Sequence, residues 1–207
     1  MSEILKLSKE RREQLYKTIG ESFADTMLIA KEKDCPMYSD DHGTRGIAQS
    51  EFGVKGFWTQ ALAILGLHRK LISSEELEKI NASLCSLNYR HTTISGQTLF
   101  HAAKTAGWTN TDMFTIVLDT LNSPTIELRS SMIVIVDFFY RLWKEPVLSD
   151  FQREALVFAV LDTIAQRKSR IEILKFAAVL IPNRFLLIPI AGKHLLKLLA
   201  AWRSLRV

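Results

Sequence analysis

Two short segments, residues 36–39 and 54–58, have the composition of buried strands and are separated by a segment of helical length. Strands joined through a helix run parallel to each other. Parallel sheets occur almost only as several strands covered on both faces. A third strand candidate, residues 89–94, is rich in threonine and aromatic side chains. Two or three strands of this length do not make a stable parallel sheet, so we expect neighbouring strands from elsewhere.

The first 94 residues otherwise read as helices. Ser8 opens a helix that runs to about Ile19, and Gly20 breaks it. Ser22 is expected to cap a second helix, with Asp25 as the acid of a capping box. Further helices are expected from residue 42 to Gly53, over 60–70 after a Thr59 cap, and over 75–87 after a cap at Ser73 or Ser74.

The remaining residues carry helical patterns and turn signals. Amphipathic helices are expected over 95–106, 111–121, 124–144 and 149–168, followed by apolar helical segments interrupted at Pro182 and Pro189. Self-similarity at the periods of common helical repeats is not convincing enough to predict a solenoid. The expected fold is therefore an α/β region with a short parallel sheet over 1–94 and an all-α region over 95–207, mostly helical overall.

Three carboxylates are placed where a metal site could form. Asp25 lies in the first turn of its helix, and Asp40 and Asp41 follow the strand over 36–39. Ligands of open α/β sheets bind at this carboxyl edge of the strands. Gathered carboxylates repel each other unless a cation joins them, and Mg²⁺ and Mn²⁺ prefer oxygen ligands. The alternative is structural: Asp25 caps its helix, and Asp40-Asp41 forms a turn and N-cap.

The order of these features resembles the PIN-domain nuclease family. Residues 22–32 resemble the helix that carries one catalytic acid in PIN domains, and residues 36–41 resemble the strand that ends in a Ser/Thr-x-Asp motif. Residues 45–48 and 52–59 look like the helix and strand that follow. Residues 60–87 are similar to an extension in PIN domains of larger bacterial multidomain proteins, so the resemblance covers about residues 22–94.

The resemblance implies a three-layer α/β/α fold and cleavage of RNA that depends on Mg²⁺ or Mn²⁺. It implies Asp25 and Asp41 as catalytic residues and, with Asp40, as metal ligands; the supporting residues would be Ser39, His42 and Arg45. A PIN site also takes an aspartate from the end of a first strand and usually a glutamate from an early helix, and neither pattern precedes Asp25. We therefore expect only the C-terminal half of a PIN domain, completed by a longer product or a partner chain, or else inactive.

The basic charge is concentrated near the C-terminus. The chain has a formal net charge of +5, whereas residues 163–207 carry nine Lys and Arg against the single acid Glu172, a net +8. Such a segment favours contact with RNA or an acidic protein partner, and the candidate residues are Arg167, Lys168, Arg170, Lys193 and Lys197. The alternative is a solvated helix face.

Cysteine spacing and hydropathy indicate a reduced, cytoplasmic protein. Cys35 and Cys85 are 50 residues apart and are expected to be buried thiols. The longest apolar stretch, residues 171–190, is broken by charges and prolines and is therefore expected to be buried helix rather than a membrane span. The function expected first is a metal-dependent endoribonuclease fragment or subunit, and the second is a non-catalytic helical interaction module that retains a PIN remnant.

Overall fold

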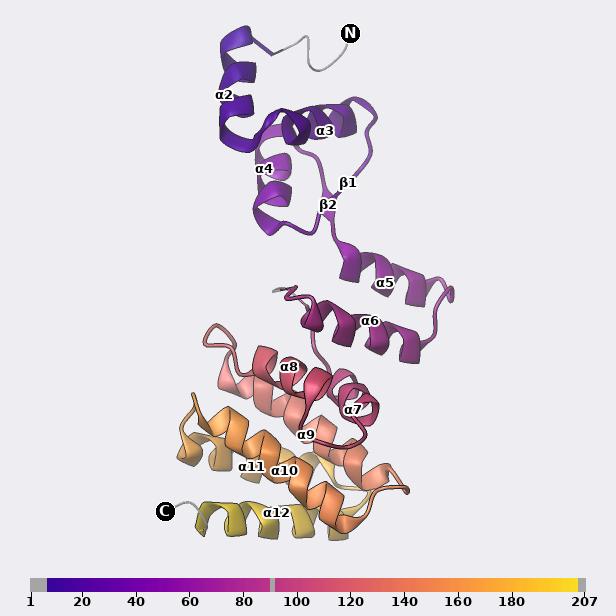
Figure 1. Ribbon diagram of the computed structural model, residues 1–207, viewed down its shortest axis with the longest axis vertical. Helices are drawn as coiled ribbons and strands as arrows, with labels where there is room; N and C mark the ends of the chain where they lie inside the picture. The colour runs from indigo at the N-terminus through magenta and orange to yellow at the C-terminus, as the bar shows by residue number, and fades with distance from the viewer. Residues whose placement is uncertain (1–6, 90–91, 205–207) are drawn as a thin grey trace. The chain divides into compact units, whose positions relative to one another are not determined.

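The computed structural model describes residues 7–89 and 92–204, which are mostly helical with one short parallel sheet (Figure 1). The chain forms two compact units, Met1–Ile72 and Ser73–Val207. We call them the N-terminal unit and the C-terminal unit. The expected mixture of a small α/β region and a larger helical region is confirmed.

The N-terminal unit contains α2 (Lys9–Ile19), α3 (Glu21–Glu32), β1 (Met37–Tyr38), α4 (His42–Phe52), β2 (Gly56–Phe57) and α5 (Thr59–His68). Ser8 caps α2 as expected, since its hydroxyl accepts a hydrogen bond from the amide of Arg11 at 3.2 Å. The expected cap at Ser22 is wrong. Gly20, with φ 85°, ends α2 and also begins α3, which places Ser22 inside the first helical turn.

The sheet of this unit is parallel, as the connecting helix predicts. Met37 pairs with Gly56 and Tyr38 with Phe57, and α4 connects the two strands. The core beneath it is formed by α3, α4 and the residues flanking the strands: Ala24, Met27, Leu28, Met37, Ala48, Phe52 and Val54. Of the third expected strand, residues 90–91 lie outside the described residues, and residues 89 and 92–94 do not form a strand. Among the residues described, the sheet has two strands.

The C-terminal unit contains α6 (Ser74–Ser86), α7 (Gly96–Thr105), α8 (Asp112–Leu121), α9 (Leu128–Lys144), α10 (Asp150–Ala165), α11 (Arg170–Arg184) and α12 (Pro189–Ser204). The even-numbered helices begin at residues 74, 112, 150 and 189, which are 38, 38 and 39 residues apart. Each of the three intervals holds one helical hairpin. No convincing repeat is visible in the sequence alone, so this regular spacing is a finding of the structure.

Packing in the C-terminal unit follows the same order. Helices α7, α9 and α11 contact one another in sequence and form one layer. Helix α8 contacts both α6 and α10, and α12 reaches α10 through a hydrogen bond from the Trp202 indole to Asp162 (2.8 Å), which makes the second layer. Stacked hairpins with neighbour contacts are the arrangement of α-solenoid repeats. One continuous core runs through the unit, from Ala82 on α6 to Trp202.

The boundary between the units differs from the one expected at residues 94 and 95. Helix α6 packs against α7 and α8, and Glu78 on α6 accepts hydrogen bonds from Ser95 and Thr98 at the start of α7. These contacts place α6 with the helices that follow it. The contacts therefore divide the chain after Ile72.

Several local expectations also need correction. Helix α5 begins at Thr59 rather than after it, and α9 begins at Leu128 because residues 124–127 form a turn. Pro182 lies inside the last turns of α11 instead of interrupting it. Cys85 is buried as expected, but Cys35 is exposed in the turn after α3. Within the described ranges, each helix is too short or too polar to span a bilayer.

Candidate functional site

Asp41 is the N-cap of α4 and stands just after β1. Its Oδ1 accepts a hydrogen bond from the amide of Thr44 at 2.5 Å. This bond, with a smaller contribution from the charge of Arg45, lowers the pKa of the exposed Asp41 carboxyl below its usual value. The amide of Asp41 in turn donates to the hydroxyl of Ser39 at 3.2 Å. Asp41 is therefore an ionised carboxylate held at the end of the strand.

Asp40 joins the carboxyl ends of the two strands. Its Oδ1 accepts from the amide of Thr59 and its Oδ2 from the hydroxyl of Thr59, both at 2.9 Å. The hydroxyl of Tyr38 also donates to Asp40 Oδ2 at 2.7 Å. Because Thr59 begins α5 shortly after β2, Asp40 links the segment that follows β1 to the segment that follows β2. Its observed contacts are structural, and the sequence did not identify Thr59 as its partner.

Arg45, on α4, contacts residues at the same end of the sheet. Its guanidinium donates to the carbonyl of Ser39 at 2.7 Å and lies over the Trp58 ring at 4.9 Å from the centroid. The side chain crosses Gly56 so closely that a Cβ there would meet Arg45 Cγ at 2.6 Å. The Trp58 indole N–H is buried and has no hydrogen-bond partner among the residues that the structure describes. His42, the first residue of α4, is exposed at this edge.

Asp25 is half-buried on α3 and bonded to α2. The hydroxyl of Tyr16 donates to Asp25 Oδ1 at 2.8 Å, and this bond raises the pKa of Tyr16. Helix α3 reverses into β1 through a tight turn in which the Cys35 amide bonds to the carbonyl of Ala30 at 3.0 Å. Sequence reasoning missed Tyr16, because nothing in its local pattern marks it as a partner nine residues away.

Asp25 and Asp41 lie on different elements of the N-terminal unit, Asp25 in the first half of α3 and Asp41 at the start of α4. The described residues hold no group of three or more His, Cys, Asp or Glu side chains arranged for a metal ion. The metal centre expected from Asp25, Asp40 and Asp41 stays a prediction.

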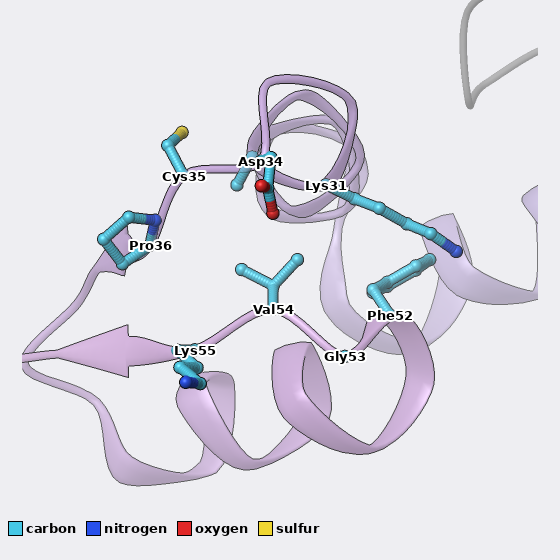
Figure 2. A pocket seen from close by; sticks show the side chains of 9 residues that line it. Lys31, Asp34, Cys35, Pro36, Phe52, Gly53, Val54 and Lys55 are labelled. Atoms are coloured by element: carbon cyan, nitrogen blue, oxygen red, sulfur yellow. The ribbon is translucent and has the colours of Figure 1, made fainter.

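A hollow of about 370 Å³ lies at the opposite end of the sheet (Figure 2). Cys35 and Pro36 lead into β1, and Lys55 directly precedes β2, so the hollow lies at the amino ends of the strands. The other lining residues are Ala30, Lys31, Asp34, Phe52, Gly53 and Val54. It is therefore separate from the edge where Asp40 and Asp41 stand.

The basic candidates near the C-terminus divide into two groups. Arg167 and Lys168 donate to the carbonyls of Asn122 and Ile126, at 3.5 and 2.9 Å, and hold the segment between α8 and α9. Arg170 lies over the Trp202 ring at 5.6 Å from its centroid. Lys193 and Lys197 are exposed on α12. The structure therefore assigns packing contacts to the first three residues, and RNA binding by all five stays a prediction.

Residues 1–50 match the family model described as the PIN domain associated with the TPR-GreAB-C-PIN system. The N-terminal part of this chain is therefore similar to a PIN domain of that system. The matched range contains α2, α3, β1 and most of α4, with Asp25, Asp40 and Asp41 among them. It begins before residue 22, where the resemblance was expected to start, and ends well before residue 94. No curated protein and no solved structure matches the chain.

Proposed function

We propose that the N-terminal unit is part of a metal-dependent PIN-type endoribonuclease, with Asp25 and Asp41 as ligands of Mg²⁺ or Mn²⁺ and Asp40 as an auxiliary acid. One observation carries the proposal. The PIN-related range includes these acids, and Asp40 and Asp41 follow β1 at the edge where parallel strands present ligands. Oxygen ligands of this kind suit both cations.

The three aspartates provide the oxygen ligands that such a cation prefers, but too few of them for a complete two-ion site. Tyr16 donates a hydrogen bond to Oδ1 of Asp25 and Thr44 donates one to Oδ1 of Asp41, and each carboxylate also has a second oxygen that can coordinate a cation. Bound divalent ions would supply activation of water and stabilisation of the leaving oxygen of a phosphodiester. The described part of the chain holds no group of three or more candidate ligands, and a site for two ions would take more acids than Asp25, Asp40 and Asp41.

We therefore propose that another polypeptide segment completes both the acid set and the sheet. Among the described residues the parallel sheet has two strands of two residues each, whereas parallel sheets usually consist of several strands covered on both faces, and an edge strand can pair with a further strand. The description of the matching family names a TPR-GreAB-C-PIN system. A protein of that system is the partner that this proposal favours, and RNA is the proposed substrate.

The test measures Mn²⁺ binding by electron paramagnetic resonance and cleavage of a fluorescent RNA, using the full chain. Asp41→Asn keeps the helix cap, because asparagine caps as well as aspartate, but it removes the charge. Asp34→Asn is the matched control, since Asp34 is an exposed acid with φ 48°, which asparagine tolerates. We expect weak Mn²⁺ binding that falls about tenfold in Asp25→Asn and Asp41→Asn and is unchanged in Asp34→Asn.

We also expect little RNA cleavage by the chain alone, because the acid set is incomplete. Equal Mn²⁺ binding in all variants would remove the metal site from the proposal. Robust cleavage by the chain alone, abolished by Asp41→Asn, would instead show that no completing segment is needed.

A second function is favoured by the structural contacts of the acids. Tyr16, Thr59 and Thr44 each engage one of the three carboxylates. In this alternative the N-terminal unit is a PIN-related remnant within a helical interaction protein. The alternative requires that Asp25→Asn and Asp41→Asn leave Mn²⁺ binding unchanged, and that Asp40→Ala lowers the midpoint of thermal unfolding.

A further inference from the structure

Two adjoining hollows lie on the layer of the C-terminal unit formed by α7, α9 and α11. The first has a volume of about 380 Å³. It is lined by Phe100 on α7, by Tyr140, Arg141 and Lys144 on α9, by Glu145 just after α9, and by Arg184 on α11. The second, of about 450 Å³, lies between α9 and α11 and is lined by Ile133, Val136, Asp137, Leu180, Asn183 and Arg184. Arg184 lines both, so the two hollows adjoin at this side chain, and we call the pair the groove.

The two halves of this groove differ in chemistry. In the first half, the guanidinium of Arg184 and the ammonium of Lys144 lie over the Tyr140 ring, at 4.5 and 5.5 Å from its centroid. In the second half, the lining is mainly aliphatic, with Ile133 about half exposed beside Leu180. A cationic and aromatic subsite therefore adjoins an apolar subsite.

Asp137 orients the two arginines of the groove. Its Oδ2 accepts from Arg141 Nε at 2.8 Å, and its Oδ1 is bonded to Arg184 Nη2. One carboxylate thus fixes two guanidinium groups from α9 and α11. Each guanidinium has five N–H donors, and a fixed fork of donors binds carboxylates with less loss of side-chain entropy. With Lys144, the groove holds three cations against the two carboxylates of Asp137 and Glu145.

We propose that this groove binds an acidic peptide segment of a protein partner, with one aliphatic or aromatic side chain in the apolar half and a neighbouring carboxylate on Arg184, Arg141 and Lys144. The surplus positive charge of the groove favours an anionic group. The apolar half favours a peptide over RNA, because RNA bases stack on aromatic rings and guanidinium planes, whereas an aliphatic surface is matched by an apolar side chain. Extended surfaces of stacked helical hairpins commonly bind partners in this way.

The experiment selects peptides on the full chain from a display library whose positions are limited to Asp, Glu, Leu, Ile, Phe, Ser and Lys. We expect enrichment of peptides that combine acidic residues with one apolar residue. The enriched peptide is then labelled with fluorescein, and its anisotropy is measured with the wild type and with variants whose circular dichroism spectrum and unfolding midpoint match the wild type.

Lys144→Glu and Ile133→Asp test the two halves of the groove, and Lys197→Glu on α12 is the control for charge reversal outside it. We expect each groove variant to weaken peptide binding at least about tenfold and the control to change it less than about twofold. Absence of enrichment, enrichment of basic peptides, or an equal loss in Lys197→Glu would overturn the proposal. Tighter binding of oligouridine than of any selected peptide, lost in Lys144→Glu, would assign the groove to RNA instead.

Discussion

At the scale of single residues, Asp41 shows how one carboxylate can be both a helix cap and a candidate metal ligand. The sequence offered it both as a PIN acid and as a helix cap, and the structure establishes the cap through Thr44. The two roles are compatible, because the Thr44 amide bonds to Oδ1 and a carboxylate has two oxygens with several acceptor positions. An N-cap also keeps the side chain in a fixed rotamer and ionised, as a metal ligand must be.

The capping role gives Asp41 a defined pH dependence. The hydrogen bonds of Thr44 lower its folded-state pKa, so its stabilising contribution is present above the unfolded pKa of about 3.9 and is lost as pH falls through the lower folded value. We expect Asp41→Ala to lower the midpoint of thermal unfolding at pH 7 by an amount that shrinks below about pH 4. Asp41→Asn should lower it much less at pH 7. An equal decrease in both variants at pH 7 would argue against the cap.

Glu78 is a buried acid on α6 that connects this helix to the start of α7. It accepts hydrogen bonds from the hydroxyls of Ser95 and Thr98, and from Asn81 at 3.3 Å. We expect Glu78→Ala to lower the free energy of unfolding by about 2–3 kcal/mol, since hydrogen bonds to a charged group are lost and buried donors are left unpaired. Urea denaturation measures this. Glu75→Ala on the exposed face of α6 is the control and should cost less than about 0.5 kcal/mol.

At the scale of elements, local chemistry predicted most helix ends and tertiary contacts decided the exceptions. Ser73 caps α6 and Gly53 ends α4 with a positive φ, both as the sequence indicates. The capping box at Ser149 is a finding of the structure. The predicted start of α9 at Pro124 failed. The segment before Leu128 is held as a turn partly by Lys168, which lies 42 residues from its acceptor Ile126. Such a distant contact leaves no local signal.

The candidate site was predictable only in outline. The sequence pattern placed Ser39, Asp40 and Asp41 after a strand, which the structure shows, because strand ends and caps are local features. Their role as a metal site stays a prediction. Their partners Tyr16 and Thr59 come from other elements and were not found. The repeat of 38 residues was hidden for a related reason: its caps vary between Ser73, Thr111 and Ser149, and helices need only matching apolar faces, not matching residues.

The junction of α4 with β2 makes a paired prediction about two glycines. A Cβ at Gly56 would meet Arg45 Cγ at 2.6 Å, so Gly56→Ala must displace Arg45 from Trp58 and should destabilise the N-terminal unit by about 1–3 kcal/mol. Gly46 lies inside α4 with open space at its Cβ, so Gly46→Ala should stabilise by about 0.5–1 kcal/mol. Thermal unfolding followed by circular dichroism distinguishes the signs. The same sign for both would contradict the contact with Arg45.

At the scale of the whole molecule, the chain divides into two compact units after Ile72. Helix α6 supplies Ala82 and Cys85 to the core that runs to α12. We expect a fragment of residues 73–207 to unfold in one cooperative transition. A fragment of residues 95–207, cut at the boundary expected from sequence, should lack a sharp transition because it exposes the surface that α6 covers. Two equally cooperative fragments would show that α6 does not belong to this unit.

The basic C-terminal residues cannot be tested by truncation after residue 162, because α11 and α12 contribute Ile173, Leu195 and Trp202 to the core. Single substitutions separate charge from packing. Arg167 holds the segment after α8, so Arg167→Ala should act mainly on stability. Lys193 and Lys197 are exposed on α12, so any contribution they make to RNA binding should be purely electrostatic.

The double variant Lys193→Ala, Lys197→Ala therefore gives the sharper prediction. If both lysines contact phosphates, the log–log slope of single-stranded RNA affinity against salt should fall by about 1.4, since each contact contributes about 0.7. The measurement is a salt titration of oligouridine binding by anisotropy, with wild type and variant in parallel. Because the other three candidates make contacts within the protein, we expect a shallow wild-type slope. An unchanged slope in the double variant would mean that α12 carries its charge as a solvated helix face.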